Sequence, residues 1–194
     1  MARTYTVTAN DVISAARVLL NDTDTQPRNS DPDMMDWLNE ALNMALTANP
    51  ALFSQIGQHV CISGFRQQVE TPRSVAVLDV FGVPQTDAAT LTQFIPGWHN
   101  GTQGAAQNWM RVAQEPLAFE VYPPSPNGQV LTILYVESPA PLTSLADLVP
   151  MTENYQPALI DYLVARASSI DDEHVLSGRA AAFNDRFTAA VRAA

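Results

Sequence analysis

The two ends of the chain carry apolar residues at helical spacing, and this constrains the fold more than any other feature. In the stretch 30–48 the apolar positions recur every three or four residues, as in a helix that buries one face. These positions are Met34, Trp37, Leu38, Ala41, Leu42 and Ala45. Ser30 provides a hydroxyl cap before a first-turn proline and acidic residues. Pro50 ends the helix, because proline disfavours helical geometry at the residue before it.

Three more helices are expected from the same kind of pattern. Thr8 provides an N-cap, with the carboxylate of Asp11 three places on, for a first helix that runs to about Leu20. Thr152 opens a third helix, and the stretch 176–191 carries the apolar stripe of a fourth. One helical pair therefore lies at each end of the chain.

The middle of the chain changes to short, β-branched or alternating stretches that are broken by glycine and proline. Strands are expected at 60–63, 67–71, 75–80 and 109–112, around 119–121, and at 130–136. Residues 123–128 are expected to form a proline-rich hairpin loop between the last two strands. Residues 87–94 can form one or two helical turns, and residues 96–108 are expected to be an exposed excursion.

These patterns predict an α+β chain, with a helical bundle built from the N- and C-terminal helix pairs and a central antiparallel β-rich insertion. The expected boundaries are 1–56 for the N-terminal helices, 57–150 for the insertion with its exposed loops, and 151–194 for the C-terminal helices. The length of 194 residues fits one domain that carries such an insertion.

The charge balance argues against two classes of partner. The chain has 10 basic residues, all of them arginine, against 20 acidic residues, for a net charge of -10. A surface this acidic repels phosphates, which disfavours groove binding of nucleic acid and docking on an anionic membrane. DNA can still pass nearby without sticking. No apolar run reaches the length of a membrane span or of a signal peptide, so no membrane partner is expected.

One segment, residues 22–33, places oxygen ligands at alternate positions, as a calcium loop does. Pro27 occupies the position that needs glycine for the sharp turn, and Arg28 would place a cation against the calcium. We therefore favour an interhelical loop with capping carboxylates, and expect no metal site.

Few residues are arranged for catalysis, and no cofactor is expected. His59 and Cys61 alternate along one expected strand, so both would lie on the same face and could form a Cys–His pair. A small core thiol beside a surface imidazole is the favoured interpretation, and a single cysteine excludes an internal disulfide. The three acidic residues at 171–173 do not point at a common centre and indicate a solvated helix corner.

A few residues are candidates for protein contacts. They are Trp98, His99, Tyr122, Pro123, Pro124, Arg166 and Asp171. The first two lie at the tip of the expected excursion, where a tryptophan either meets a partner or folds back on its own domain. The next three lie on the expected hairpin tip, which a sheet can hold rigidly. Arg166 lies in an apolar stripe, so its cation needs a partner, either among the nearby acids or on a neighbouring subunit.

Several blocks along nearly the whole chain resemble the head-to-tail adaptor proteins of tailed bacteriophages. The opening of this resemblance is the block 8–22, followed by Ser-Asp at 30–31 and Trp-Leu-Asn-Glu-Ala at 37–41. The later blocks are Val-Leu-Asp-Val at 77–80, Pro-Gly-Trp-His at 96–99, Phe-Glu-Val-Tyr-Pro-Pro at 119–124, and the stretches 158–167 and 180–187. Each block is short, and their common order and spacing carry the resemblance. The lack of lysine and the Gly/Gln/Ala-rich residues 101–107 depart from the pattern of the family.

The resemblance implies a structural virion protein and not an enzyme. Such adaptors are assembled in the host cytoplasm and form a homo-oligomeric ring, commonly a dodecamer, at the capsid–tail junction. The ring binds the portal protein on one side and a tail or nozzle protein on the other, and during genome ejection DNA passes through its channel without specific binding. Two alternatives stay open: a non-viral oligomeric interaction module, and an enzyme of unrecognised type that uses the His59/Cys61 pair.

Overall fold

The computed structural model describes residues 5–170 and 177–193. The chain divides into two compact units, which we call the helical unit and the β unit. The helical unit comprises Met1–Phe53 and Pro139–Ala194, and the β unit comprises Ser54–Ser138. The predicted α+β class, with helices at both ends of the sequence and antiparallel strands between them, is confirmed.

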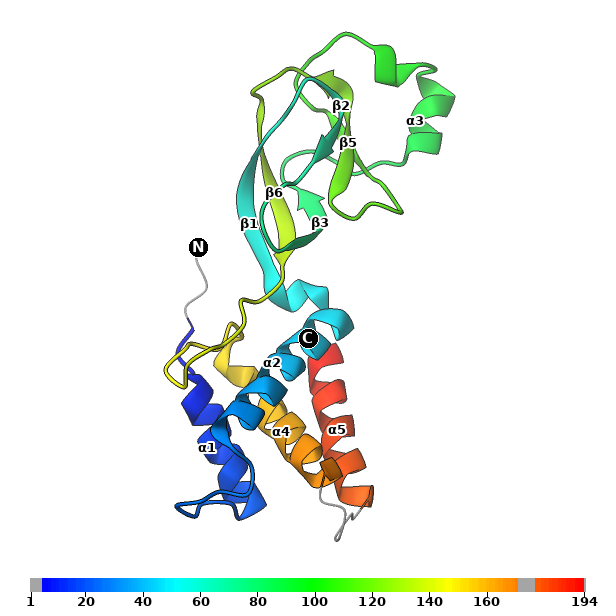
Figure 1. Ribbon diagram of the computed structural model, residues 1–194. Helices are drawn as coiled ribbons and strands as arrows, with labels where there is room; N and C mark the ends of the chain where they lie inside the picture. Colours follow the sequence, from blue (N-terminus) through cyan, green and yellow to red (C-terminus); the bar gives the residue numbers. More distant parts are fainter. Residues whose placement is uncertain (1–4, 171–176, 194) are drawn as a thin grey trace. The chain divides into compact units, whose positions relative to one another are not determined.

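The helical unit is a bundle, and the third of its helices along the chain lies at the centre. Its helices are α1 (Ala9–Leu20), α2 (Asp31–Ala48), α4 (Gln156–Ile170) and α5 (Ser177–Arg192), with short 3-10 turns η1 (Pro50–Phe53) and η3 (Glu153–Tyr155). Helix α4 packs against each of the other three, as Figure 1 shows. Its side chains Leu159 and Leu163 are accordingly buried in the centre of the unit. None of the helices in the described part of the chain has the length and apolar character needed to cross a membrane.

The helix boundaries follow the predicted local signals. Thr8 and Asp11 form a reciprocal capping box at the start of α1, which satisfies two backbone donors that the helix itself cannot. The Ser30 hydroxyl accepts a hydrogen bond from the Asp33 N–H at the start of α2. Helix α2 ends at Ala48, two residues before Pro50, as predicted.

Residues 139–150, which the sequence placed in the insertion, lie on the helical unit. The Val149 N–H donates to the Val7 carbonyl oxygen at 2.9 Å. The Asn39 side chain of α2 bonds both backbone groups of Leu142, at 2.8 and 3.0 Å. These bonds and the burial of Leu142 and Val149 attach the segment to the bundle, so the β unit ends at Ser138.

The β unit contains two three-stranded antiparallel sheets, in the orders β1-β6-β3 and β2-β5-β4. The strands are β1 (Ser54–Val60), β2 (Gly64–Gln68), β3 (Ser74–Val80), β4 (Asn108–Arg111), β5 (Ala118–Ser125) and β6 (Val130–Glu137). Side chains from both sheets share one core, in which Trp109, Phe119 and Ile133 are buried. Helix α3 (Ala88–Phe94) and a 3-10 turn η2 (Trp98–Asn100) lie in the long connection from β3 to β4.

The prediction of a strand at 60–63 is wrong, because the strand ends where that stretch begins. Strand β1 occupies residues 54–60. The fully buried Gln67 side chain accepts a hydrogen bond from the Ile62 N–H at 2.8 Å and donates to the Ile62 and Gly64 carbonyls at 2.9 and 3.0 Å. Both backbone groups of Ile62 therefore bond to the Gln67 side chain, and strand pairing resumes only at Gly64, which pairs with Ser125 of β5.

The predicted hairpin loop at 123–128 is also wrong. Strand β5 continues through Pro123 and Pro124 to Ser125, and β5 and β6 belong to different sheets. The N–H groups of Gly104 and Gln107 donate to carbonyl oxygens of β5 at 2.9 and 2.7 Å, so residues expected to be a loop are part of a bonded strand. The chain turns at Pro126–Gln129 instead, through a bond at 3.4 Å between these two residues.

Candidate functional site

The connection from β3 to β4 folds back on the β unit as an ordered arm. The Asp87 carboxylate caps α3 by accepting from the Thr90 N–H at 2.7 Å. The helix ends at Phe94, and the chain turns at Gly97, whose φ of 75° lies in the left-handed region. Side chains other than glycine rarely adopt that conformation. The turn places η2 next to α3.

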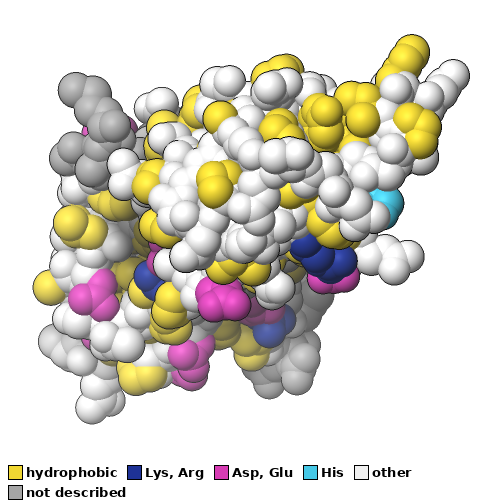
Figure 2. All heavy atoms as spheres, turned by 90° about the horizontal axis from the view of Figure 1, so that it is seen from above, with side chains coloured by type: hydrophobic (Ala, Val, Ile, Leu, Met, Phe, Trp, Pro, Cys, Tyr) yellow, Lys and Arg dark blue, Asp and Glu magenta, His cyan; other side chains and the backbone are white. Residues whose placement is uncertain are grey.

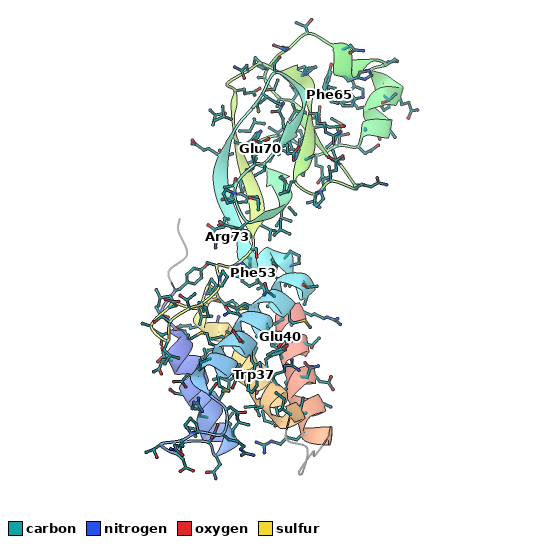
Figure 3. All side chains as sticks on the ribbon, in the orientation of Figure 1. Trp37, Glu40, Phe53, Phe65, Glu70 and Arg73 are labelled. Atoms are coloured by element: carbon teal, nitrogen blue, oxygen red, sulfur yellow. The ribbon has the colours of Figure 1, made fainter. Side chains whose placement is uncertain are left out.

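Trp98 is a core residue of this arm and not an exposed one. Its side chain is 5% exposed and packs in a cluster with Leu91 and Met110. The indole N–H donates to the Thr92 hydroxyl at 3.1 Å, and the ring meets the edge of Phe65 at a centroid distance of 5.4 Å. Of the two alternatives for Trp98, the aromatic folded back on its own domain describes its placement. Figure 3 marks Phe65 in this part of the β unit.

The structure brings together the two segments that contain candidate contact residues, 98–99 and 122–124. His99 is exposed and lies edge-on to the Trp98 ring, at 5.7 Å between centroids. Tyr122 packs on the same cluster as Trp98. Pro123 approaches Gly104 so closely that a Cβ there would lie 3.1 Å from its Cγ. Pro123 is half-buried and Pro124 is buried, so the arm covers most of the proline pair and leaves the turn at 126–128 exposed.

The exposed aromatic side chain of the arm is Phe94, which the sequence reasoning missed. It is 75% exposed, and Ile95 beside it is 37% exposed. A signal was available: residues 88–108 contain no Asp, Glu, Lys or Arg in a chain of net charge -10. We call Phe94 and Ile95 the apolar knob.

A second exposed apolar surface lies on the sheet β1-β6-β3. Ile56 and Val60 alternate outward from β1 and are 60% and 61% exposed, and Val130 of β6 is 53% exposed. Val60 and Val130 are directly paired across the two strands. We call these three residues the outer sheet face.

His59 and Cys61 do not make a reactive pair. Burial lowers the pKa of His59, an effect that the neighbouring Gln67 side chain partly offsets. Burial raises the pKa of the Cys61 thiol, against a smaller opposite effect from Ser125. At neutral pH the thiol is therefore protonated, whereas nucleophilic attack needs the thiolate. The thiol is in the core, as predicted, but the His59 ring is half-buried and packs edge-on against Phe119 at 5.2 Å.

Arg166 finds its partner within its own bundle. Its Nε lies 3.1 Å from the Glu40 carboxylate of α2, and Figure 3 marks Glu40 on that helix. Burial, together with the negative charge of Glu40, raises the pKa of the adjacent Tyr162 to about 12. Asp171, the other candidate partner, lies outside the described residues.

The 22–33 segment is an interhelical loop organised by one buried carboxylate, as the favoured interpretation held. Asp22 is 5% exposed and accepts from the N–H groups of Arg28 and Asn29 at 2.6 and 3.2 Å. The Arg17 guanidinium lies 3.2 Å from the same carboxylate and 2.6 Å from Asp31. Within residues 5–170 and 177–193, no three His, Cys, Asp or Glu side chains are grouped as metal ligands would be.

The fold defines a two-unit α+β protein whose β unit carries exposed apolar side chains. The model of the SU10 adaptor protein family matches residues 7–194. The chain therefore belongs to this family of phage head-to-tail adaptors, which confirms the resemblance drawn from the sequence. It is a bacteriophage adaptor and a structural protein of the virion. No curated protein matches the chain.

Proposed function

We propose that this protein forms a homo-oligomeric ring, dodecameric as in the adaptors it resembles, between the portal protein and the tail or nozzle protein. The ring surrounds the DNA exit channel at the capsid–tail junction. The observation that carries the proposal is the family match over residues 7–194, which includes both structural units. The proposed role is structural, and no residue is assigned to catalysis.

The distribution of charge supports a channel that lets DNA slide. The net charge is -10 without any lysine, and several of the arginines are bound to carboxylates of the same chain. The paired arginines are Arg17, Arg66, Arg73, Arg166 and Arg186. Guanidinium groups held in this way are less available to phosphates, so the proposed lumen is acidic and repels the DNA backbone. A ring whose channel is lined by the arginines would refute this part of the proposal.

The exposed turn at 126–128 and the neighbouring His99 are the proposed contacts with another virion protein. The turn directly follows strand β5, and His99 lies in η2, which packs against that strand. Deleting the 96–101 loop would remove the buried Trp98 and damage the fold, so point substitutions make the sharper test. Asn127→Arg and His99→Glu should leave the thermal unfolding midpoint unchanged and reduce tail attachment. Normal virion assembly by both variants would refute the assignment.

The deciding experiment measures mass. The purified protein is examined by light scattering and negative-stain microscopy, alone and after mixing with the portal ring of the same phage. A ring in either sample supports the proposal. A monomer or dimer that ignores the portal ring contradicts it, and returns attention to a dimeric interaction module.

A further inference from the structure

Three of the four sheet edges in the β unit are protected against pairing with another chain. Exposed edge strands present free backbone groups, and proteins shield them with charges, bulges, short strands or covering segments. Strand β3 carries Asp79 and two shifts of register, and β2 carries Arg66 and one shift. Strand β4 has only four residues and is covered by residues 84–86, through bonds of 3.1 and 2.9 Å to Trp109.

Strand β1 carries no charged residue, proline or bulge along its edge. It has seven residues and pairs with β6 in an unbroken register. It contains neither a charged residue nor a proline, and the whole stretch 41–65 lacks Asp, Glu, Lys and Arg. Its outward side chains Ile56 and Val60 belong to the exposed outer sheet face. An edge of this kind favours association with another protein surface.

The apolar knob lies on the other side of the same unit. In Figure 1, β1 lies on one side of the β unit and α3 on the opposite side. Seen from above, hydrophobic side chains gather on the part that projects at the right, the side on which α3 lies in Figure 1 (Figure 2). Phe94 at 75% exposure is the most exposed of the large apolar side chains in the described part of the chain, and an isolated aromatic of this kind is suited to fill an apolar surface.

The absence of charge on both surfaces favours a second copy of this chain as the occupant. Two copies of net charge -10 repel each other, so their contact is least opposed where neither surface carries acidic residues. The knob, in the uncharged stretch 88–108, and the outer sheet face, on the uncharged stretches 41–65 and 121–136, meet this condition. Because the two surfaces differ and lie on opposite sides, their contact is heterologous and repeats from copy to copy, and a heterologous contact can close into a ring.

We propose that the apolar knob (Phe94 and Ile95) of one copy packs on the outer sheet face (Ile56, Val60 and Val130) of the next copy. This inference rests on the proposed ring and names the surfaces that build it. A different virion protein bound on either surface is the competing outcome, which the experiments below identify.

Disulfide cross-linking tests the contact directly. Phe94→Cys is combined in one chain with Ile56→Cys or with Val60→Cys, and the concentrated protein is oxidised mildly. Cys61 is retained, because it is buried and its raised thiol pKa keeps it unreactive. We expect a ladder of trimers and higher species, whereas Phe94→Cys alone can form only dimers. Phe94→Cys with Val18→Cys, a comparably exposed position on the helical unit (67%), is the matched control and gives no ladder beyond dimers. If neither cysteine pair gives more cross-linked species above the dimer than this control, the contact is refuted.

A charge exchange separates copy–copy packing from any other occupant. Phe94→Glu and Val60→Arg, each alone, should weaken self-association about tenfold or more, and the double variant should recover most of it. Both side chains are exposed, so circular dichroism melts should match the unmodified protein. Single variants that lose association without recovery in the double variant indicate another occupant and refute the pairing.

The two proposals fail in different ways. If light scattering shows a ring but neither cysteine pair cross-links, the knob contact is wrong and the proposed ring stands. If the cysteine pairs give a ladder but the protein never binds the portal ring, the knob contact stands and the proposed position between portal and tail is wrong.

Discussion

Replacing Asp22 by alanine should destabilise the helical unit more than any other change in the α1–α2 loop. The buried carboxylate accepts two backbone N–H bonds, one bond from the Asn29 side-chain amide at 3.2 Å and one from Arg17. After truncation, Arg17 keeps its bonds to Asp31 and to the Asn29 carbonyl, but the two backbone donors lose their acceptor. An unsatisfied buried donor costs about 1–3 kcal/mol. Because Arg28 is exposed and Asn29 is half-buried, water can replace part of the lost acceptor, so we expect a loss of about 2–3 kcal/mol in the free energy of unfolding.

Asp22→Asn separates the charge from the hydrogen-bonding geometry. Its amide oxygen can still accept one of the backbone bonds, so the expected loss is about 1–2 kcal/mol. Asp24→Ala is the matched control, because Asp24 lies in the same loop and is exposed; a surface substitution of this kind stays within about 0.5 kcal/mol. Urea unfolding followed by circular dichroism at 222 nm reports the three values, since that signal follows the helices.

The pH dependence checks the same reasoning. Burial alone would raise the pKa of Asp22, but the bonds from Arg28, Asn29 and Arg17 outweigh it, and the pKa is lowered from 3.8. A carboxyl with a lowered folded-state pKa contributes stability above pH 3.8 that is lost as the pH falls further. Asp22→Asn should therefore remove part of the acid sensitivity of the protein.

Two results would refute this account of the loop. One is a loss for Asp22→Ala no larger than that for Asp24→Ala. The other is an unfolding midpoint that rises with added calcium and falls with a chelator, because Arg17 already supplies the positive charge beside the Asp22 carboxylate.

Three further predictions concern single side chains. Burial lowers the pKa of His59 below 6.5, so the free energy of unfolding should fall as the pH drops below that value. In His59→Phe the melting temperature should therefore change less between about pH 8 and 5.5 than in the unmodified protein. Trp98→Ala should cost about 3 kcal/mol in urea unfolding through the cavity it leaves, whereas Phe94→Ala should stay within about 0.5 kcal/mol; equal losses would contradict the contrast in burial. Burial raises the pKa of Asp161 in spite of its 3.1 Å contact with Arg186. The charged form of this carboxyl is therefore less favourable in the folded protein than in the unfolded chain, and Asp161→Asn should keep or raise the melting temperature at pH 7.

The helical unit was predictable from the sequence because its signals are local. The caps at Thr8 and Ser30 and the stop before Pro50 act within a few residues. Helical periodicity also identified the faces that meet in the bundle. The partner of Arg166 could not be found in this way, because Glu40 is 126 positions away in the sequence and only the packing of α2 on α4 brings the two together.

The sequence indicated that the central part of the chain forms β-strands, but it did not indicate which strands pair with one another. The alternation in β6 gave the right strand, whereas the prolines of β5 resembled a loop, since nothing local reveals that residues 104–107 bond to that strand. Gln67 is a similar case. A glutamine in an alternating stretch indicates a solvent-facing position, yet its amide is buried because it bonds both backbone groups of Ile62, where strand β1 has already ended.

Trp98 and Phe94 show why residue type alone misplaced the exposed aromatic. Both lie in one uncharged stretch four residues apart, and tryptophan is the stronger interface residue by type. The indole carries an N–H donor that the Thr92 hydroxyl satisfies inside the unit at 3.1 Å, and a large ring with a satisfied donor gains more from burial than the smaller Phe94 ring. Trp98 occupies the space beside Phe65 and Met110. Once Trp98 fills it, Phe94 is left exposed, so a partner surface is the remaining place where its ring can be buried.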